Sequence, residues 1–250
     1  MTTRHPPSQR SDPARRGPDT SATDIATLPD AVRTFLRHGS PQLLVGGVVL
    51  AVAARVAAGV AGVGRWSVWD LAAVAAVVAL VPLVEWFVHR VVLHTAPRQL
   101  GPMWFDPGAG HRAHHQNPSS VPFVLLRGVD AAVFQVVNAA LAVCVVWSLL
   151  AVLGVDDRGG PILTGVVTAL VALTHYEWAH FLFHTAYRPR TARYRRLKAN
   201  HRLHHWRNEG YWLGITSNAG DRLARTLPAA KGDVPASATA RTLGIDPDAS

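Results

Sequence analysis

Histidine dominates the chemistry that this chain could perform, because one histidine pattern occurs twice. Each copy begins with a spaced pair and ends in an HxxHH motif, and the interval from His94 to His111 equals that from His184 to His201. Neutral imidazole is the commonest metal-ligating side chain. Ten imidazoles suit two metal ions better than one, since a single zinc site usually takes four ligands. The predicted ligands are His89, His94, His111, His114, His115, His180, His184, His201, His204 and His205.

Three of the four histidine groups have helical spacing. His180 and His184 are i, i+4 neighbours, and each HxxHH motif places its histidines at i, i+3 and i+4, so each group shares one helix face. His89 and His94 are five residues apart. On a regular α-helix that spacing separates two side chains by about 140°. We therefore expect a local break in the helix there, or contact with opposite sides of the site.

The rest of the sequence indicates a membrane protein. Of its 250 residues, 49% are hydrophobic and 16% are charged, and this charged fraction is low for a soluble protein. Four apolar runs have about the 20 residues that a bilayer requires, and they cover residues 41–63, 68–88, 129–155 and 162–183. These runs predict an all-α integral membrane fold with four transmembrane helices in two hairpins. A cytosolic helical cap would carry the histidine-rich dinuclear metal site.

Composition also predicts the domain boundaries. Residues 1–38 form a basic segment predicted to be disordered, apart from a short amphipathic helix over residues 30–38 that could lie on the membrane. Residues 39–228 form the four-helix domain with its cap, and residues 229–250 form a second disordered tail. Arg55 lies inside the first apolar run, where a charge is costly, so it is expected to snorkel or to face protein.

The distribution of positive charge predicts the orientation. The net charge is +9, and the two short turns between apolar runs hold only Arg65 and Arg158. The positive-inside rule therefore places both termini, the middle loop and all ten histidines on the cytoplasmic side, at the inner membrane if the chain is bacterial. With four spans and no recognisable motif, nucleic-acid binding is not expected. The single cysteine, Cys144, excludes an intrachain disulfide and a thiolate metal site.

Further residues around the histidines form short motifs, one of which occurs in both copies. Glu-Trp pairs precede both copies at residues 85–86 and 177–178, and Gly-Ile-Thr and Asp-Arg-Leu follow at residues 214–216 and 221–223. With the histidines, these motifs resemble the fatty acid hydroxylase/sterol desaturase superfamily of membrane di-iron enzymes over about residues 80–227. The spacing is most similar to that of the fatty acid 2-hydroxylases. One departure is Ala219-Gly220 before Asp221, where such proteins usually carry an aromatic residue.

The resemblance implies an O2-dependent monooxygenase that hydroxylates, or desaturates, a lipid acyl chain. It implies two iron ions at the ten histidines, with zinc possible in purified protein, O2 as co-substrate, and neither heme nor nicotinamide bound by this chain. No fused cytochrome b5 segment is recognisable. We therefore expect a separate electron donor, either a cytochrome b5-like protein or a ferredoxin with its reductase.

Residues next to the histidines are candidates for supporting roles. Histidine ligands generally donate their second N–H to a carboxylate or carbonyl, so Glu85 and Glu177 are predicted to support the ligands; the alternative is an ion pair with an arginine. Tyr176 precedes His180 by four residues, and the resemblance implies that it borders the substrate. The lower-ranked candidates are His175, Asn200 and Asp221.

Two other functions remain open at the level of sequence. The same metal centre could oxidise a carotenoid or sterol, which would require a wider and more rigid pocket. A histidine-rich membrane metal transporter or sensor is an alternative of another class. The predicted gathering of the histidines at one membrane face argues against a transporter, whose ligands should follow a path through the bilayer.

Overall fold

Helices make up nearly all of the regular structure in a computed structural model of the chain, which describes residues 20–244. The chain divides into two compact units. The unit that we call the histidine unit contains residues 20–32, 83–126 and 179–244 of the described chain. The other, the membrane unit, contains residues 33–82 and 127–178.

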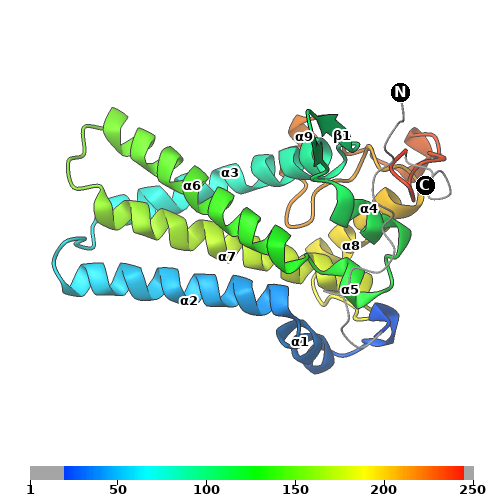
Figure 1. Cartoon of the computed structure of the whole chain (residues 1–250), viewed down its shortest axis with the longest axis horizontal. Helices are drawn as coiled ribbons and strands as arrows, with labels where there is room; N and C mark the ends of the chain where they lie inside the picture. The colour runs from blue at the N-terminus through cyan, green and yellow to red at the C-terminus, as the bar shows by residue number, and fades with distance from the viewer. Residues whose placement is uncertain (1–19, 245–250) are drawn as a thin grey trace. The chain divides into compact units, whose positions relative to one another are not determined.

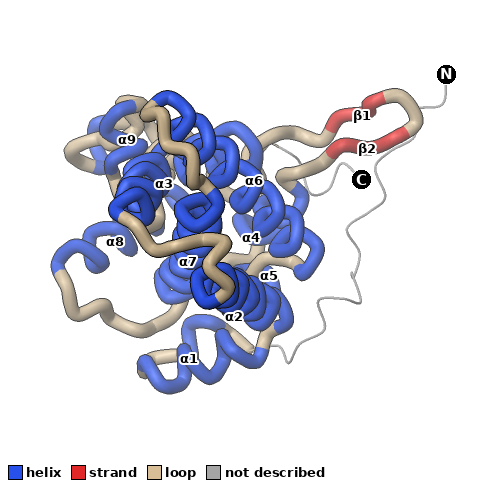
Figure 2. Tube along the Cα trace, turned by 90° about the vertical axis from the view of Figure 1, so that its left-hand side faces the viewer, coloured by secondary structure: helices blue, strands red, loops and turns tan. Residues whose placement is uncertain are grey.

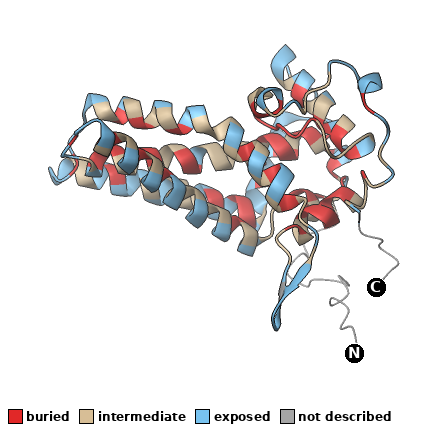
Figure 3. Cartoon of the chain, turned by 90° about the horizontal axis from the view of Figure 1, so that it is seen from above, coloured by how far each residue is buried: buried red, intermediate tan, exposed pale blue. Residues whose placement is uncertain are grey.

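Four helices of the described chain are long and apolar enough to cross a membrane, which confirms the four predicted spans. Figure 1 shows the helices α2 (Gly39–Val60), α3 (Val68–Phe87), α6 (Gly128–Val152) and α7 (Gly159–His184). The last turns of α3 and α7 belong to the histidine unit. Only 11% to 28% of the most apolar window of each span is buried, and Figure 3 shows the outward faces as exposed. Such exposed apolar helix faces suit lipid rather than water.

Small side chains allow three helices of the membrane unit to pack closely. The buried cluster consists of Ala73 and Val77 from α3, Ala142, Val146 and Leu150 from α6, Val155 from the loop before α7, and Ala169 from α7. Gly165 of α7 touches α6 so closely that a Cβ atom there would lie 2.6 Å from Val146 Cγ2. Close approach at small residues is the usual basis of helix packing in lipid.

Arg55 of α2 faces protein, which is one of the two arrangements expected for it. The side chain is buried and donates hydrogen bonds of 2.8 Å to Asp70 Oδ1, to Thr164 Oγ1 and to the carbonyl of Gly64. Its guanidinium also lies 3.5 Å from the centroid of the Trp66 ring. The charge is therefore paired and hydrogen-bonded, as a buried charge at membrane depth requires.

The histidine unit is built from short elements that follow the ends of α3 and α7. They are the π-helix η3 (Val88–Leu93), β1 (Arg98–Leu100), β2 (Met103–Phe105), α4 (Ala109–Gln116), α5 (Val121–Val124), α8 (Ala192–Trp206) and α9 (Ala219–Leu223).

Strands β1 and β2 form a small antiparallel hairpin, which Figure 2 shows in red and which the all-α prediction did not include. Gly101, with a φ of 60°, begins its two-residue loop. Glycine followed by proline suits a tight hairpin turn.

The structure differs from the predicted disorder at both ends of the described chain. Helix α1 (Leu28–Arg37) corresponds to the short amphipathic helix predicted over residues 30–38. The short helices η2 (Ala22–Asp24) and η4 (Lys231–Asp233), in contrast, lie in segments predicted to be disordered. Ala22, Val234 and Ala240 are buried. The prediction of disorder came from the average composition of each segment. An average does not show that a few apolar residues of a polar segment can pack against the rest of the protein. Residues 1–19 and 245–250 lie outside the described part of the chain.

Candidate metal centre

The ten predicted ligands lie together in the histidine unit, in two groups of five within the described chain. In each group, the five candidate ligand nitrogens all lie within 4.8 Å of one another. We call these groups the first and second clusters. The first cluster consists of His89, His94, His111, His115 and His204. The second cluster consists of His114, His180, His184, His201 and His205.

The two sequence copies exchange one histidine each. His204, from the second copy, completes the first cluster, whereas His114, from the first copy, completes the second cluster. Both residues are the middle histidine of an HxxHH motif. Neither copy alone therefore supplies five ligands to one site, and the two sites depend on each other through α4 and α8.

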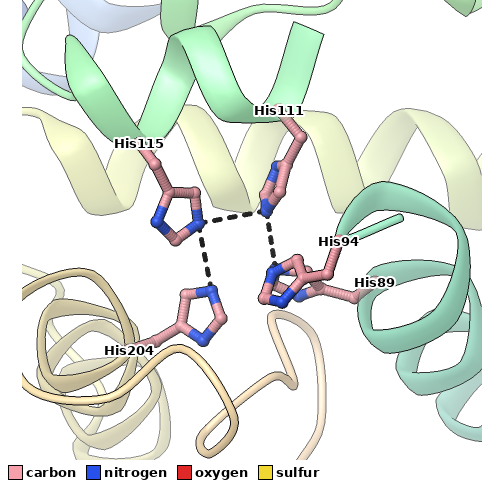
Figure 4. A group of neighbouring side chains, drawn as sticks. All are labelled: His89, His94, His111, His115 and His204. Carbon is pink, nitrogen blue, oxygen red and sulfur yellow. Dashed lines mark hydrogen bonds between the residues drawn. The ribbon is translucent and has the colours of Figure 1, made fainter. Parts of the chain in front are cut away.

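The π-helix η3 resolves the irregular spacing of His89 and His94. A π-helix forms i to i+5 hydrogen bonds, so it is wider than an α-helix and brings residues five apart toward one face. His89 lies in η3 and His94 directly follows it, and their ring centroids are 5.1 Å apart. The predicted local helix break is therefore a π-helix, and Figure 4 shows both rings directed toward the same cluster.

The regular helices position the remaining ligands. Helix α4 presents His111 and His115 to the first cluster, as Figure 4 shows, and presents His114 to the second. Helix α8 presents its own HxxHH motif, and the Thr191 hydroxyl caps that helix by accepting a hydrogen bond from the backbone N–H of Tyr194. The i, i+3, i+4 spacing thus places the histidines of each helix on one face.

The imidazole Nε2 atoms point toward one another at short distances. In the first cluster, His111 Nε2 lies 3.1 Å from His89 Nε2 and from His115 Nε2, and His115 Nε2 lies 3.2 Å from His204 Nε2. The second cluster has four such contacts, of 2.8–3.2 Å: His184–His201, His114–His205, His201–His205 and His114–His180.

These distances fit metal ions bound between the rings. Two nitrogens about 2.1 Å from one ion, at angles of about 90–110°, lie about 3.0–3.4 Å apart. His94 Nε2, in the first cluster, is buried and has no hydrogen-bond partner among the described residues. A metal ion would satisfy such a nitrogen and would also replace the contacts between like nitrogens. The donor set of buried imidazoles therefore fits a transition metal in each cluster.

Burial keeps these imidazoles neutral. Loss of solvent, followed by the proximity of other histidines, lowers the pKa of His111, His114, His201 and His205 below the usual histidine range. Burial lowers the pKa of His115 to about 3. A neutral imidazole retains the lone pair that a metal ion requires. The lowered pKa values therefore favour metal binding over protonation at these histidines.

Backbone carbonyls orient three ligands of the first cluster. The Nδ1 atoms of His89, His204 and His115 lie 2.6, 2.9 and 2.7 Å from the carbonyl oxygens of Leu213, Tyr211 and Ala240, respectively. A carbonyl only accepts, so each Nδ1 carries the proton and each Nε2 presents its lone pair to the cluster. Such supporting contacts fix both the tautomer and the ring orientation of a metal ligand.

Two buried carboxylates hold the loop that supplies two of these carbonyls. Glu85 accepts hydrogen bonds from the backbone N–H groups of Ile215 and Thr216 and from the Thr216 hydroxyl. Asp221 accepts from the backbone N–H groups of Leu213 and Gly214, at 3.0 and 2.7 Å. Glu85 and Asp221 were predicted as supporting residues, and the structure places them against this loop rather than against imidazole rings.

The same loop requires glycine at its tightest point. A Cβ atom on Gly214 would lie 2.1 Å from the carbonyl oxygen of Ser217 and 3.0 Å from Asp221 Oδ2. Trp212 has a φ of 54° and is buried. The Gly-Ile-Thr phrase of the sequence therefore serves to shape the loop that carries the carbonyls of Tyr211 and Leu213.

The other predicted site residues lie elsewhere. Asn200 donates a 3.3 Å hydrogen bond to the side chain of Asn218. Tyr176, Glu177 and His175 belong to the part of α7 that lies in the membrane unit, where Glu177 is buried, Tyr176 is half-buried and His175 is exposed. Their functional roles stay predictions.

Sequence reasoning missed the carbonyl oxygens of Tyr211, Leu213 and Ala240. Every residue except proline carries the same backbone donor and acceptor, so residue types give no signal for such contacts. The sequence singled out the Gly-Ile-Thr phrase next to two of these carbonyls, but only as part of the family resemblance. Nothing marked Ala240, which lies in the segment expected to be disordered.

Fold and site together define a class of protein: a multi-pass membrane protein with a candidate dinuclear centre of ten histidines. The model of the fatty acid hydroxylase family matches residues 74–226, which is more than half of the chain. The chain therefore belongs to the fatty acid hydroxylase family.

Comparison with curated proteins finds a relative named dihydroceramide fatty acyl 2-hydroxylase from Arabidopsis thaliana. The chain is 29% identical to it over 150 residues, covering 59% of this chain and 57% of the relative. The match thus spans less than two thirds of the length of that protein. No solved structure matches the chain significantly.

Proposed function

We propose that this chain is a membrane-bound di-iron oxygenase that hydroxylates a lipid acyl chain, using O2 and electrons from a separate protein. The observation that carries the proposal is the pair of buried five-histidine clusters in a member of the fatty acid hydroxylase family. The name of the Arabidopsis relative supports an acyl chain as substrate over a rigid sterol or carotenoid.

The ten histidines would hold the metal. Two bound iron ions would supply the oxidising power that an unactivated C–H bond requires. The histidines contribute neutral nitrogen ligands, which withstand such chemistry better than readily oxidised thiolates. Imidazole ligands accept iron, zinc and manganese alike, so zinc could replace iron in purified protein. Burial of the rings would limit the access of water to the bound ions.

Residues of α7 before His180 are proposed to meet the substrate. Tyr176 lies one helical turn before His180 in the sequence, where an acyl chain could approach, and Glu177 is buried beside it in the helix. Replacing Tyr176 by Phe should raise the KM for the lipid more than it lowers kcat. Replacing Glu177 by Gln should weaken metal retention or turnover, and unchanged values for both would return Glu177 to a structural role.

The distribution of positive charge supports a cytoplasmic metal centre with both termini on the same side, and thus two helical hairpins beneath a cytosolic cap. An electron donor of the cytochrome b5 or ferredoxin type would then approach from the cytoplasm. Single-cysteine variants at the exposed residues Met103, in strand β2 before α4, and Arg202, in α8, test this topology in intact cells once Cys144 is replaced. Labelling from opposite sides would contradict a single cytoplasmic centre.

Metal and product analysis tests the function itself. Protein purified in mild detergent should contain about two transition-metal ions per chain. Cells that express it under 18O2 should accumulate a lipid with one 18O atom on its acyl chain. His114→Ala and His204→Ala should each lose about one of the two ions and, with it, the product. A metal-free folded protein, or metal transport into sealed vesicles without a lipid product, would overturn the oxygenase and favour the transporter or sensor.

A further inference from the structure

His115 occupies a central place in the candidate metal centre. The residue is fully buried, and its Nε2 lies 3.1 Å from His111 Nε2 and 3.2 Å from His204 Nε2, both in the first cluster. Its ring centroid also lies 4.1 Å from that of His205, in the second cluster. Any rotation of the His115 ring would therefore disturb the first cluster and the boundary between the two.

The far C-terminal part of the described chain orients this ring. The carbonyl oxygen of Ala240 accepts a 2.7 Å hydrogen bond from His115 Nδ1, and Ala240 is itself buried. His89 and His204 receive the equivalent contact from the loop at residues 211–213, which lies inside the family match. Ala240 lies beyond that match, which ends at residue 226.

The next residue, Arg241, binds the end of the helix that carries His115. Its Nε and Nη2 atoms donate 2.7 Å hydrogen bonds to the carbonyls of His115 and Gln116, which end α4. Its guanidinium lies 4.2 Å from the centroid of the Trp206 ring, at the end of α8. A cation that satisfies the last carbonyls of a helix is favourable there. Arg241 thus joins the C-terminal segment to both helices that carry HxxHH motifs.

Further hydrogen bonds attach the rest of the segment to the end of α8 and the residues after it. Arg207 donates two bonds to the Val234 carbonyl, at 3.1 and 2.7 Å, and its own carbonyl accepts a 2.7 Å bond from Ser237 N–H. Thr239 Oγ1 donates to Glu209 Oε1 at 2.5 Å. This many specific contacts indicate a docked element rather than a loose tail.

We propose that residues 231–244, which we call the docked segment, are a positioning element of the metal centre. In this proposal the Ala240 carbonyl fixes the tautomer and orientation of His115, and Arg241 holds that carbonyl against α4. The proposal deepens the proposed function and rests on it, because it requires the histidine clusters to bind metal.

Truncation and metal release test the proposal. Three chains would be purified in mild detergent: full length, ending after Ala230, and ending after Gly244 as the control that retains the docked segment. Metal per chain and its loss to excess EDTA would be followed by elemental mass spectrometry. Loss of a contact that supports a metal ligand typically weakens metal affinity about 10–100-fold. The shorter chain should therefore release one of its two ions about 10–100-fold faster, while the control matches full length.

A point variant provides the same test without deleting residues. Arg241→Ala should accelerate release of one ion in the same direction as the truncation. Arg158→Ala is the matched control, since Arg158 also donates to a carbonyl, that of Val155, and faces a tryptophan ring, that of Trp147, but in the membrane unit. Circular dichroism would verify the helical content of both variants. Arg241→Ala decides the question if the truncated chain fails to fold.

Pairing Arg241→Ala with ligand variants identifies the affected ion. With His184→Ala, which should disable the second cluster, Arg241→Ala should speed loss of the remaining ion. With His111→Ala, which should disable the first cluster, it should leave the remaining ion unchanged. Equal release rates with and without Arg241, in a full-length protein that holds two ions, would overturn the positioning role. A metal-free full-length protein would instead overturn the proposed function.

Discussion

Two residues, His114 and His204, link the two halves of the candidate metal centre. Each is the middle histidine of its motif, and each belongs to the cluster formed mainly by the other copy. With this arrangement, one HxxHH helix serves both sites. Loss of one helix should therefore disturb both ions, although each cluster keeps its own set of five nitrogens.

Paired histidine replacements test this exchange. His204→Ala should lose about one of two ions, and His204→Ala with His111→Ala should lose no more, because both residues belong to the first cluster. His204→Ala with His184→Ala should lose both ions, since the residues lie in different clusters. Metal content per chain measures each case. Substitutions that affect one site are non-additive, whereas those at separate sites add. The reverse pattern would show that each sequence copy holds its own ion.

Among the elements, the π-helix η3 and the α-helix α7 each bring two histidines onto one helix face, but with different helix geometries. In α7, His180 and His184 share a face because they are four residues apart on an α-helix. His89 and His94 are five apart, and the wider π-helix compensates for the extra residue. The first copy thus resembles the second with one residue inserted.

Deleting single residues tests that interpretation. Removal of Val92 would leave His89 and His94 at i, i+4, so a regular α-helix should present both rings and retain about two ions. Removal of Leu182 from α7 would leave His180 and His184 three apart, on a helix that is already regular, and should reduce metal content to about one ion or less. Metal per chain and helical content by circular dichroism provide the comparison. Equal loss in both deletions would contradict the compensating role of η3.

Lys198 of α8 closes the C-terminal end of α7. Its Nζ donates to the carbonyls of Thr185 and Tyr187, at 2.6 and 2.7 Å, and to that of Leu182 at 3.4 Å. Carbonyls at a helix end otherwise lack partners. Burial, aided by the charge of Arg202, lowers the pKa of Lys198 to about 8. The lysine therefore stabilises the turn that follows His184, although partial removal from water makes its charged form less favourable.

This lowered pKa predicts a dependence of stability on pH. Between pH 8 and about 10.5 the unfolded chain retains the Lys198 proton while the folded chain loses it, so the free energy of unfolding rises with pH in that window. Lys198→Met cannot titrate. The Tm of the native protein minus that of Lys198→Met should therefore increase from pH 8 to 10 and stay level from pH 6 to 7.5. A constant difference across the whole range would show that the pKa is not lowered.

At the scale of the whole molecule, each of the two units has its own buried polar network. The membrane unit is organised around Arg55, Asp70 and Thr164, whereas the histidine unit is organised around the imidazoles and the loop that Glu85 holds. The Arg55–Asp70 pair lies within the helices proposed to cross the bilayer. There, removing one charge leaves the other unpaired in a medium that solvates it poorly.

The Arg55–Asp70 pair can be tested by single and double replacement. Arg55→Leu should destabilise the protein by about 3–5 kcal/mol, because it leaves the buried Asp70 carboxylate without its cation. Arg55→Leu with Asp70→Leu should recover most of that loss. Unfolding by sodium dodecyl sulfate in mixed micelles, followed by circular dichroism, measures both. A double variant that is as unstable as the sum of the two single variants would indicate that the pair has no coupling.

Much of this architecture could be predicted from the sequence because the relevant signals are local. Hydropathy identified the four spans, since crossing a bilayer depends on length and apolarity along one helix. Spacing grouped the histidines by helix face, and the five-residue interval indicated an irregular turn at the position of η3. The hairpin of β1 and β2 was missed because its two short strands carry little pattern.

The sequence by itself determined which residues could bind metal and which helices could cross a membrane. Only the tertiary structure decided how those residues combine. The exchange of His114 and His204, the role of Glu85 in holding a loop, and the contact of Ala240 with His115 all join residues far apart in the chain. Such contacts depend on how helices pack and on backbone groups that every residue shares. Residue type could therefore mark Glu85 as a supporting residue, but it could not identify the partners in these contacts.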